Sequence, residues 1–397
     1  MKKTIQILFV SAVLLLLAGM CILTLCFPQT QPGEYDVWEN RTLAEIPVLS
    51  RSTLSDGSYF SSVEQYLSDH LYGRTDLLRG NVRYRMLRGN VSVNTVVSGS
   101  NALMNDNGLY DRFDLWYRTA AGLMADRLAV IRDAAEACGG TFVFVGVPAQ
   151  RTVFREEYPE YLNSGSEQYR DVTECFTEAL LANGIRTVFP EEQFLQSGIP
   201  LTELYSPIDH HFTLKGAYLC CNAVLDALTE DGVAGVEKVT EDRITFETLP
   251  NPMLGTYNRR LYGCAKITDH LWICHSDAAV PYERWDNGIR TDTPLTVLPK
   301  SDTDYVTYSA YMEGDKAETV VRTYRPELKK LLIVGDSFTN AMETLLYMSF
   351  DEMRSLDFRY YSEKTLTEYI ADYQPDVVLV VRDASVYVSL DGNGDLR

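Results

Sequence analysis

Positive charge is scarce in this sequence. It contains 36 lysine and arginine residues against 55 aspartate and glutamate residues, which gives a formal net charge of −19. Lys2 and Lys3 are the only charged residues before Glu34, so the rest of the chain carries 34 − 55 = −21. A field of this sign repels phosphate backbones and argues against a nucleic-acid partner. It also disfavours strongly anionic polymers relative to neutral or zwitterionic ones, unless a local basic patch overrides the average.

Low-complexity tracts and metal-binding cysteine motifs are absent as well. Apolar residues make up 46% of the chain and aromatic residues 11%, which excludes a largely disordered protein. The sequence has eight cysteines but no C-x-x-C motif, so zinc-ribbon and thioredoxin-like proteins have no support. Cys264 and Cys274 flank a predicted hairpin and could form a disulfide. No cofactor is expected.

The first long apolar run lies at the N-terminus. Residues 4–27 carry no charge and follow Lys2 and Lys3. A run of this length can cross the hydrocarbon core of a bilayer, which takes about 20 residues. Positive charge before the run and acidic residues after it place the lysines in the cytoplasm and the rest of the chain outside. We therefore expect a cytoplasmic stub at 1–4 and an uncleaved single-pass anchor in the cell membrane at 5–27, with a cleaved signal peptide or a buried helix as the alternatives.

Helix and strand patterns alternate through the rest of the chain. After a stalk at 28–56, a domain over 57–397 is expected to be α/β with a parallel sheet, interrupted by a β-rich insertion at 236–325. Apolar spacing predicts helices at 57–88, 115–138, 167–183, 213–229, 339–350 and 363–372. Apolar β-branched runs predict strands at 141–149, 185–189, 331–334, 356–361 and 375–381. Within the insertion, 258–268 and 270–276 are predicted to be the arms of a hairpin.

A turn with the sequence Gly-Asp-Ser follows one of the predicted strands. Gly335 allows a tight turn, and Ser337 stands at the start of the next helix. Amide groups at a helix N-terminus favour developing negative charge, so a serine at this position is suited to act as a nucleophile. The alternative is that Asp336 or Ser337 only caps the helix.

A second polar motif, Asp209-His210-His211-Phe212, precedes another predicted helix. Histidine is rare, with five in the whole chain, and two of them are adjacent here. A carboxylate two positions from a histidine can orient the imidazole as a general base for a serine. The motif is also compatible with a turn, with exposed loop residues or with part of a metal site, but no third and fourth metal ligands have a recognisable spacing. No metal is expected.

Together the two motifs resemble the DHHW protein family, which is related to SGNH-hydrolase-like acetyltransferases of the alginate O-acetylation type. The resemblance covers most of the chain after the N-terminal run and implies an SGNH-hydrolase-like three-layer domain. The sequence departs from the family pattern at Phe212, where the family has tryptophan. Weaker parts of the resemblance are Glu39-Asn40-Arg41, Asp69-His70, Gly73-Arg74, Gly255-Thr256-Tyr257 and Pro375-Asp376. For Asp69 and Arg74 a structural salt link is expected.

Carried over to this sequence, the resemblance implies a catalytic triad. Ser337 would be the nucleophile, His211 the base, and Asp209 the group that orients the imidazole. The candidates for stabilising the oxyanion are the Ser337 amide, Asn340 and Gly255. The candidates for binding substrate are Phe212, Tyr257 and Arg382.

The resemblance also implies a function. It implies an extracytoplasmic, membrane-anchored serine O-acetyltransferase that works through an acetyl-serine intermediate. The acceptor would be a cell-surface or secreted polysaccharide, and a membrane-bound O-acyltransferase partner would carry acetyl across the membrane. Two alternatives remain open: an SGNH-type carbohydrate esterase, with water as the acceptor, and a non-catalytic glycan-binding scaffold of an envelope assembly. Transfer and hydrolysis differ in water exclusion and acceptor binding, which the sequence does not specify.

Overall fold

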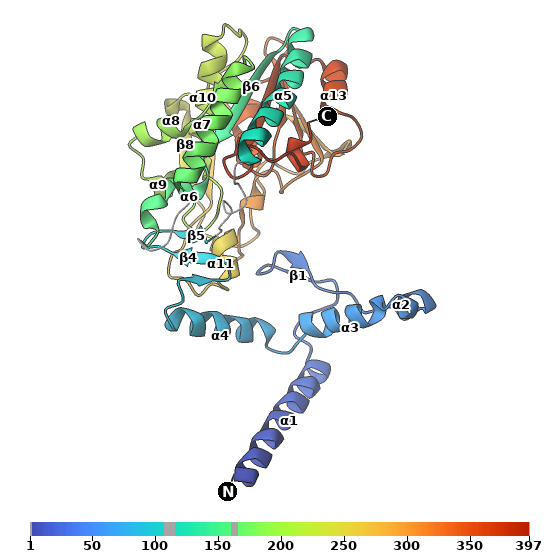
Figure 1. Cartoon of the computed structure of the whole chain (residues 1–397). Coiled ribbons are helices and arrows are strands. Elements are labelled where there is room, and N and C mark those ends of the chain that lie inside the picture. Colours follow the sequence, from blue (N-terminus) through green and yellow to red (C-terminus); the bar gives the residue numbers. More distant parts are fainter. Residues whose placement is uncertain (1, 107–115, 160–165, 397) are drawn as a thin grey trace. The chain divides into compact units, whose positions relative to one another are not determined.

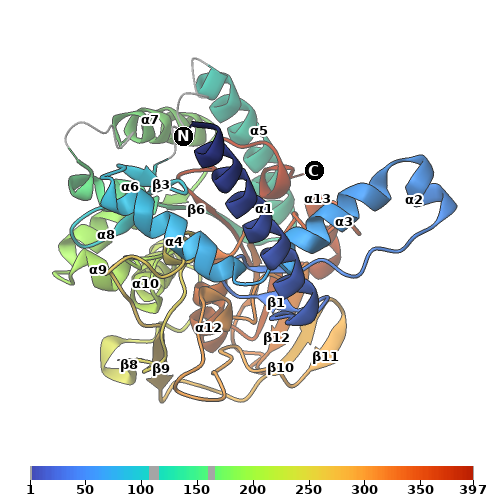
Figure 2. The same cartoon turned by 90° about the horizontal axis from the view of Figure 1, so that it is seen from below.

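Residues that are far apart in the chain combine to form two units. The structure, a computed structural model, describes residues 2–106, 116–159 and 166–396. Unit 1 consists of Met1–Asn94 together with Asn258–Lys266, and unit 2 of Thr95–Tyr257 together with Ile267–Arg397. Figures 1 and 2 show the elements from two directions. These two units do not correspond to the anchor, stalk and domain expected from the sequence. The limits of those expected parts stay predictions.

Unit 1 begins with the apolar helix α1 (Lys2–Cys26). At 1.5 Å per residue its length is about 37 Å, whereas the hydrocarbon core of a bilayer is roughly 30 Å thick. Within the described residues, Lys3–Cys26 is the one stretch of helix that is long and apolar enough to cross a membrane. A signal sequence meets the same criterion, so cleavage and orientation stay predictions. The other elements are β1 (Tyr35–Asp36), β2 (Arg41–Thr42), α2 (Arg51–Ser55), α3 (Ser58–Asp69), α4 (Arg74–Leu87) and β3 (Ser92–Val93).

An ion-pair network stabilises unit 1. Arg41 donates to both oxygens of the Asp69 carboxylate, from Nη1 to Oδ2 at 2.7 Å and from Nη2 to Oδ1 at 2.5 Å. These hydrogen bonds hold the pKa of Asp69 down, at about 2, although burial acts in the opposite sense. Glu39 pairs with both Arg41 and Arg74. Asp69 and Arg74 therefore both take part in structural ion pairs, as expected, but each pairs with a residue outside their own segment, Asp69 with Arg41 and Arg74 with Glu39.

The centre of unit 2 is a sheet that has eight strands in the described residues, in the order β11-β10-β12-β14-β13-β15-β6-β7. The pairs from β14 to β7 are parallel, and those from β14 to β11 are antiparallel. Strands β6, β13 and β15 are buried along almost their whole length, as apolar strands covered on both faces are. The bounds are β6 (Thr141–Val147), β7 (Thr187–Val188), β10 (Glu283–Asp286), β11 (Ile289–Thr291), β12 (Glu318–Arg322), β13 (Lys330–Val334), β14 (Glu352–Leu356) and β15 (Val377–Asp383).

Helices cover both faces of this sheet. Helices α5 (Trp116–Ala137), α7 (Ser166–Ala182) and α13 (Leu366–Tyr373) share one apolar core with Phe144, Leu332 and Val380 of the sheet. Helices α10 (Leu214–Glu230) and α12 (Phe338–Leu346) pack on the other face (Figure 2). The α/β class and the largely parallel sheet predicted from the sequence are confirmed. The remaining elements are β4 (Val96–Ser98), β5 (Leu103–Asn105), α6 (Gln150–Val153), α8 (Glu191–Gln196), α9 (Leu201–Leu204) and α11 (Thr256–Arg260).

The segment expected to be a β-rich insertion contributes strands to two sheets. Strands β8 (Ile244–Thr248) and β9 (Trp272–Ser276) pair with each other, while β10, β11 and β12 extend the main sheet. The hairpin predicted between 258–268 and 270–276 is wrong, because the first arm begins inside helix α11 and the second pairs with β8. All eight cysteines lie in the described part of the chain and are free, Cys264 and Cys274 included.

Candidate active site

The serine of the Gly-Asp-Ser turn stands where strand β13 passes into helix α12. Ser337 is the N-cap residue of this nine-residue helix and is half-buried. A Cβ atom on Gly335 would lie 2.5 Å from Cγ2 of Thr339 and 3.0 Å from the carbonyl oxygen of Val381. The turn can therefore approach strand β15 this closely because residue 335 has no side chain.

A short loop fixes the Asp-His-His motif in front of helix α10. The Ser206 amide donates to the His211 carbonyl at 3.1 Å, and the Thr213 amide donates to the Leu204 carbonyl at 2.8 Å. The hydroxyl of Thr213 then caps α10 by accepting from the Gly216 amide at 3.3 Å. The loop is thus closed at its base, and Asp209 is held at its tip.

Asp209, His211 and Ser337 form one continuous line of hydrogen bonds. Nδ1 of His211 lies 2.6 Å from Oδ1 of Asp209, and Nε2 of His211 lies 2.7 Å from Oγ of Ser337. The carboxylate accepts a proton that the ring carries on Nδ1, which leaves Nε2 free to accept the hydroxyl hydrogen of Ser337. The three side chains predicted to form a triad are therefore brought together in this order.

The Asp209 carboxylate is buried and receives several donors. Its Oδ1 accepts from the His211 amide at 3.1 Å, and its Oδ2 accepts from the Thr256 amide at 2.6 Å. Burial alone would raise the pKa of Asp209, but the imidazoles of His210 and His211 and these hydrogen bonds hold it well below its ordinary value. The group is therefore a stable anion.

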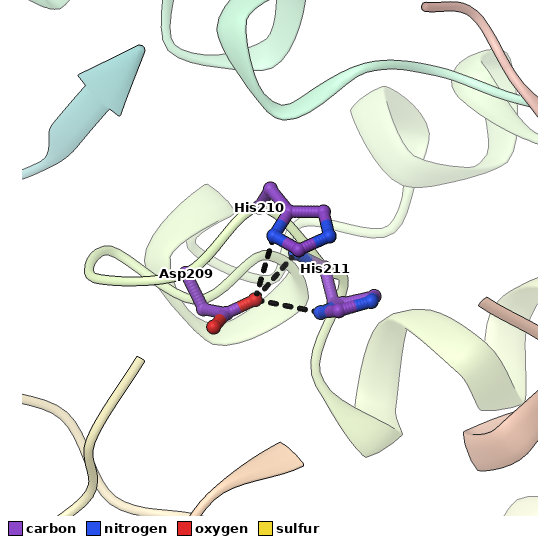
Figure 3. A group of neighbouring side chains, drawn as sticks. All are labelled: Asp209, His210 and His211. Carbon is purple, nitrogen blue, oxygen red and sulfur yellow. Dashed lines mark hydrogen bonds and ion pairs between the residues drawn. The ribbon is translucent and has the colours of Figure 1, made fainter. Parts of the chain in front are cut away.

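Both histidines of the motif face the same carboxylate, as Figure 3 shows. Nδ1 of His210 lies 3.3 Å from Oδ1 of Asp209, and the two imidazole rings are 3.8 Å apart between centroids. Ligand atoms of Asp209, His210 and His211 lie within 4.8 Å of one another, which is compatible with a bound cation. However, both oxygens of Asp209 and both ring nitrogens of His211 already form hydrogen bonds, so a metal at this position would have to break the line to Ser337.

Aromatic side chains hold the His211 ring in place. Tyr308 lies flat against it, with centroids 3.8 Å apart and an interplanar angle of 3°. Phe338 contacts the same ring at 4.9 Å, and Phe212 packs edge-on against Phe338 at 5.2 Å. Sequence analysis missed Tyr308, because no motif surrounds it.

The candidate oxyanion groups differ in their surroundings. The Ser337 amide lies at the start of α12, as predicted. The Asn340 side chain is buried and donates one Nδ2 hydrogen to Asp315 at 2.9 Å. A Cβ atom on Gly255 would lie 2.4 Å from the Ile208 carbonyl oxygen, so Gly255 packs tightly beside the Asp209 loop. The roles of all three stay predictions.

The three candidates for binding substrate are all buried. Phe212, Tyr257 and Arg382 are 0%, 4% and 2% exposed. Arg382 donates to the carbonyls of Val386 and Ser389, the latter at 2.9 Å, and burial lowers its pKa to about 10. These side chains therefore pack inside unit 2 in this structure, and their roles in binding substrate stay predictions.

A carboxyl group with a raised pKa adjoins the serine. Burial, and next the charge of Asp383, raise the pKa of Asp336 to about 6. Its Oδ1 accepts from the Phe338 amide at 3.1 Å. Protonation of Asp336 as the pH falls through this value removes a negative charge beside Ser337.

Comparison with known proteins gives structural matches. The sequence matches no protein-family model and none of the curated proteins. A structure of Bacillus cereus PatB1 matches with a TM-score of 0.62 at 17% identity, over 74% of this chain and 96% of PatB1. PatB1 with a sulfonyl adduct matches with a TM-score of 0.57 at 18% identity, over 68% of this chain and 91% of that one.

A DHHW family protein from Eubacterium siraeum is also similar. It matches with a TM-score of 0.55 at 19% identity, over 75% of this chain and 94% of that protein. At such identities the likeness concerns the fold. The structural neighbours thus include a member of the family that the two motifs resemble, and the predicted α/β fold is confirmed.

Proposed function

We propose that this chain is a membrane-anchored serine O-acetyltransferase that acts on a polysaccharide outside the cytoplasm. The observation that carries the proposal is the hydrogen-bonded line from Asp209 through His211 to Ser337, with distances of 2.6 and 2.7 Å. A hydroxyl is a weak nucleophile by itself, and an imidazole within hydrogen-bond reach is what activates it. The resemblance to the DHHW family supplies the reaction class.

In the first step Ser337 accepts the acetyl group. Its Oγ attacks the carbonyl carbon of an acetyl ester while Nε2 of His211 takes the hydroxyl proton. The bond from the carbonyl carbon to the leaving oxygen then breaks, and His211 returns the proton to that oxygen. The anion of Asp209 stabilises the imidazolium that exists between these two transfers. The amide at the start of α12 favours the oxyanion.

In the second step a sugar hydroxyl takes the place of the leaving group. His211 accepts the proton of the acceptor hydroxyl, whose oxygen attacks the acetyl carbon of acetyl-Ser337. The ester bond to Oγ breaks, the proton returns to Oγ, and the acetylated sugar leaves. Water in the acceptor position would make the same residues an esterase, so the outcome depends on how well the acceptor excludes water.

The proposed setting is the outer face of the cell membrane. Helix α1 has the length and composition of a membrane span. Lys2 and Lys3 before it, and the acidic chain after it, support a cytoplasmic N-terminus. By the family resemblance, a membrane-bound O-acyltransferase partner would deliver acetyl groups to Ser337.

The full chain in detergent, incubated with an acetyl ester and a neutral polysaccharide, tests the proposal. We expect acetylated polysaccharide and, in the absence of acceptor, an acetyl adduct on the Ser337 peptide by mass spectrometry. Ser337→Ala lacks the nucleophile and should lower turnover at least about 10³-fold. Ser349→Ala, at a buried serine in the same segment, is the matched control.

Three other results would contradict parts of this proposal. Release of acetate without acetylated polysaccharide would identify an esterase. Turnover that Ser337→Ala leaves unchanged would exclude this serine as the nucleophile. Glycan binding without any turnover in either form would identify a non-catalytic scaffold.

A further inference from the structure

Helix α4 carries positive charge in an otherwise acidic chain. The helix and its C-cap residue contain one acid, Asp76, and five arginines, at positions 74, 79, 83, 85 and 88. Three of these arginines bind within unit 1, to Glu39, to the Tyr262 carbonyl and to the Asn94 side chain. The other two, Arg83 and Arg88, are exposed, and neither pairs with a carboxylate in the residues that the structure describes.

The exposed face of α4 is apolar at its centre. Leu77, Tyr84 and Leu87 are 55%, 58% and 88% exposed. At roughly 100° per residue, these three side chains lie within about 80° of one another around the helix. The buried Val82 lies on the opposite side, and the two exposed arginines flank the apolar centre. Asp76 lies between Leu87 and Arg83 in this projection, at the other end of the helix, and pairs with Arg79. Apolar side chains bordered by arginine, with a tyrosine among them, are typical of helices that lie in a membrane interface.

Helix α4 begins where the apolar helix α1 ends (Figure 1). The Tyr72 amide donates to Oγ1 of Thr24 at 3.1 Å, and the Gly73 amide donates to Oε1 of Gln29 at 2.7 Å. Thr24 lies in the last turn of α1. If α1 spans a bilayer, the first turn of α4 therefore lies at the depth where the hydrocarbon gives way to headgroups.

We propose that α4 is an interfacial helix that docks on a bilayer containing acidic phospholipids. Leu77, Tyr84 and Leu87 enter the boundary between headgroups and acyl chains, and Arg83 and Arg88 bind lipid phosphates. The negative charge of the rest of the chain is repelled by the same surface, so the attraction is concentrated at this helix. The inference rests on the proposed membrane anchor and is independent of the chemistry at Ser337.

Fluorescence quenching in reconstituted full-length protein tests this docking. The vesicles contain seven parts phosphatidylcholine, brominated on its acyl chains, and three parts phosphatidylglycerol. The four native tryptophans also fluoresce, so the fluorescence of the unmodified protein is measured and subtracted. We expect strong quenching of the added signal in Leu87→Trp. The same Leu87→Trp protein in vesicles of equal lipid ratio without bromine is the matched control and gives the unquenched signal.

Removal of the exposed charges gives the second arm of the experiment. Arg83→Gln with Arg88→Gln, in the Leu87→Trp background, should shift the docking equilibrium roughly 30-fold toward the undocked state. Vesicles without phosphatidylglycerol should have a similar effect. Absence of quenching in Leu87→Trp overturns the proposal, and so does quenching that is indifferent to the arginines and to the acidic lipid.

Flotation of the same vesicles after an alkaline wash reports on the anchor separately. Protein that floats but shows no quenching at position 87 overturns only the docking of α4. Protein that does not float overturns the membrane anchor and, with it, the docking of α4. Acetyl transfer by Ser337, measured in detergent, is unaffected by either result.

Discussion

At the scale of single residues, Asp209 matters because both of its carboxylate oxygens have protein donors. Oδ1 accepts from the ring and the amide of His211, and Oδ2 accepts from the Thr256 amide. These bonds fix the rotation of the carboxylate, and the carboxylate in turn fixes which nitrogen of His211 carries the proton. The nitrogen that faces Ser337 is therefore the one that can accept.

Asp209→Asn tests this orientation. The amide is nearly the same size as the carboxylate, but it carries no charge and can donate to Nδ1, which favours the wrong tautomer of His211. We expect kcat for acetyl transfer to fall about 10⁴-fold while the fold is retained. Asp226→Asn on α10, whose side chain is 55% exposed, is the matched control. A loss of less than about tenfold in a folded Asp209→Asn protein would contradict the proposed role.

The three hydrogen-bonded residues Asp209, His211 and Ser337 could be predicted from the sequence, whereas the residues around them could not. Asp209 and His211 are two positions apart, and Gly335 and Ser337 mark a strand-to-helix turn, so short-range patterns reveal them. Tyr308 reaches the site from a remote part of the chain and belongs to no local pattern. The Gly255-Thr256-Tyr257 segment is part of the family resemblance, but its pattern does not indicate that the Thr256 amide binds Asp209. The same limit explains Phe212, Tyr257 and Arg382, whose burial depends on packing that spacing does not specify.

At the scale of elements, the sequence predicts a long helix well, but it predicts a strand that alternates apolar and charged residues poorly. The helix predicted at 115–138 is α5, Trp116–Ala137, because an apolar stripe ends at two glycines. The strand predicted at 356–361 is wrong, since β14 covers Glu352–Leu356. The charged residues of β14 interrupt the apolar pattern by which a strand is predicted. In the structure these charges are accommodated, because Glu352 pairs with Arg322 of the neighbouring strand and the Arg354 guanidinium lies 4.0 Å from the centre of the Tyr373 ring.

The ion pair between Arg41 and Asp69 makes the stability of unit 1 depend on pH. The pKa of Asp69 is about 2 in the folded chain against an ordinary 3.8. A depressed pKa means that the folded state binds fewer protons, so this stabilisation is complete above about pH 4 and is lost as the pH falls toward 2. The shift corresponds to about 2 kcal/mol. Asp69→Asn should lose this contribution in urea unfolding at pH 7.

A second measurement distinguishes this effect from a general loss of packing. Between pH 7 and pH 3, Asp69→Asn should lose less stability than the unmodified protein, because the group that titrates is gone. Asp76→Asn on α4, whose side chain is 82% exposed, should change the free energy of unfolding by less than about 0.5 kcal/mol. Equal acid sensitivity of Asp69→Asn and the unmodified protein would exclude Asp69 as the source.

At the scale of the whole molecule, the net charge of −19 should select among acceptors. At low salt an anionic polysaccharide is repelled from the protein, whereas a neutral polysaccharide of the same backbone is not. Salt shortens the range of this repulsion from about 10 Å at 0.1 M to about 3 Å at 1 M. Acetyl transfer to the anionic polymer should therefore rise with salt, while transfer to the neutral one stays nearly constant. Preference for the anionic polymer at low salt would contradict this expectation.

The fold class was accessible from the sequence, but the division into units was not. Alternation of helices with apolar strands indicates an α/β sheet wherever it occurs, and the structure has one. The division depends instead on a short segment, 258–266, that belongs with residues 1–94. Its long-range contacts, and no turn or linker pattern in the sequence, assign it to that unit.

Because residues 258–266 belong to unit 1, residues 1–94 do not form that unit by themselves. Within that unit Trp38 stacks on Tyr262, and the Asn94 side chain donates to the Arg260 carbonyl. A protein shortened to begin after residue 94 loses these partners at once. Thr256, whose amide binds Asp209, lies two residues before the segment. Since unit 1 is built from two separate stretches of the chain, no single cut of the backbone separates it from unit 2.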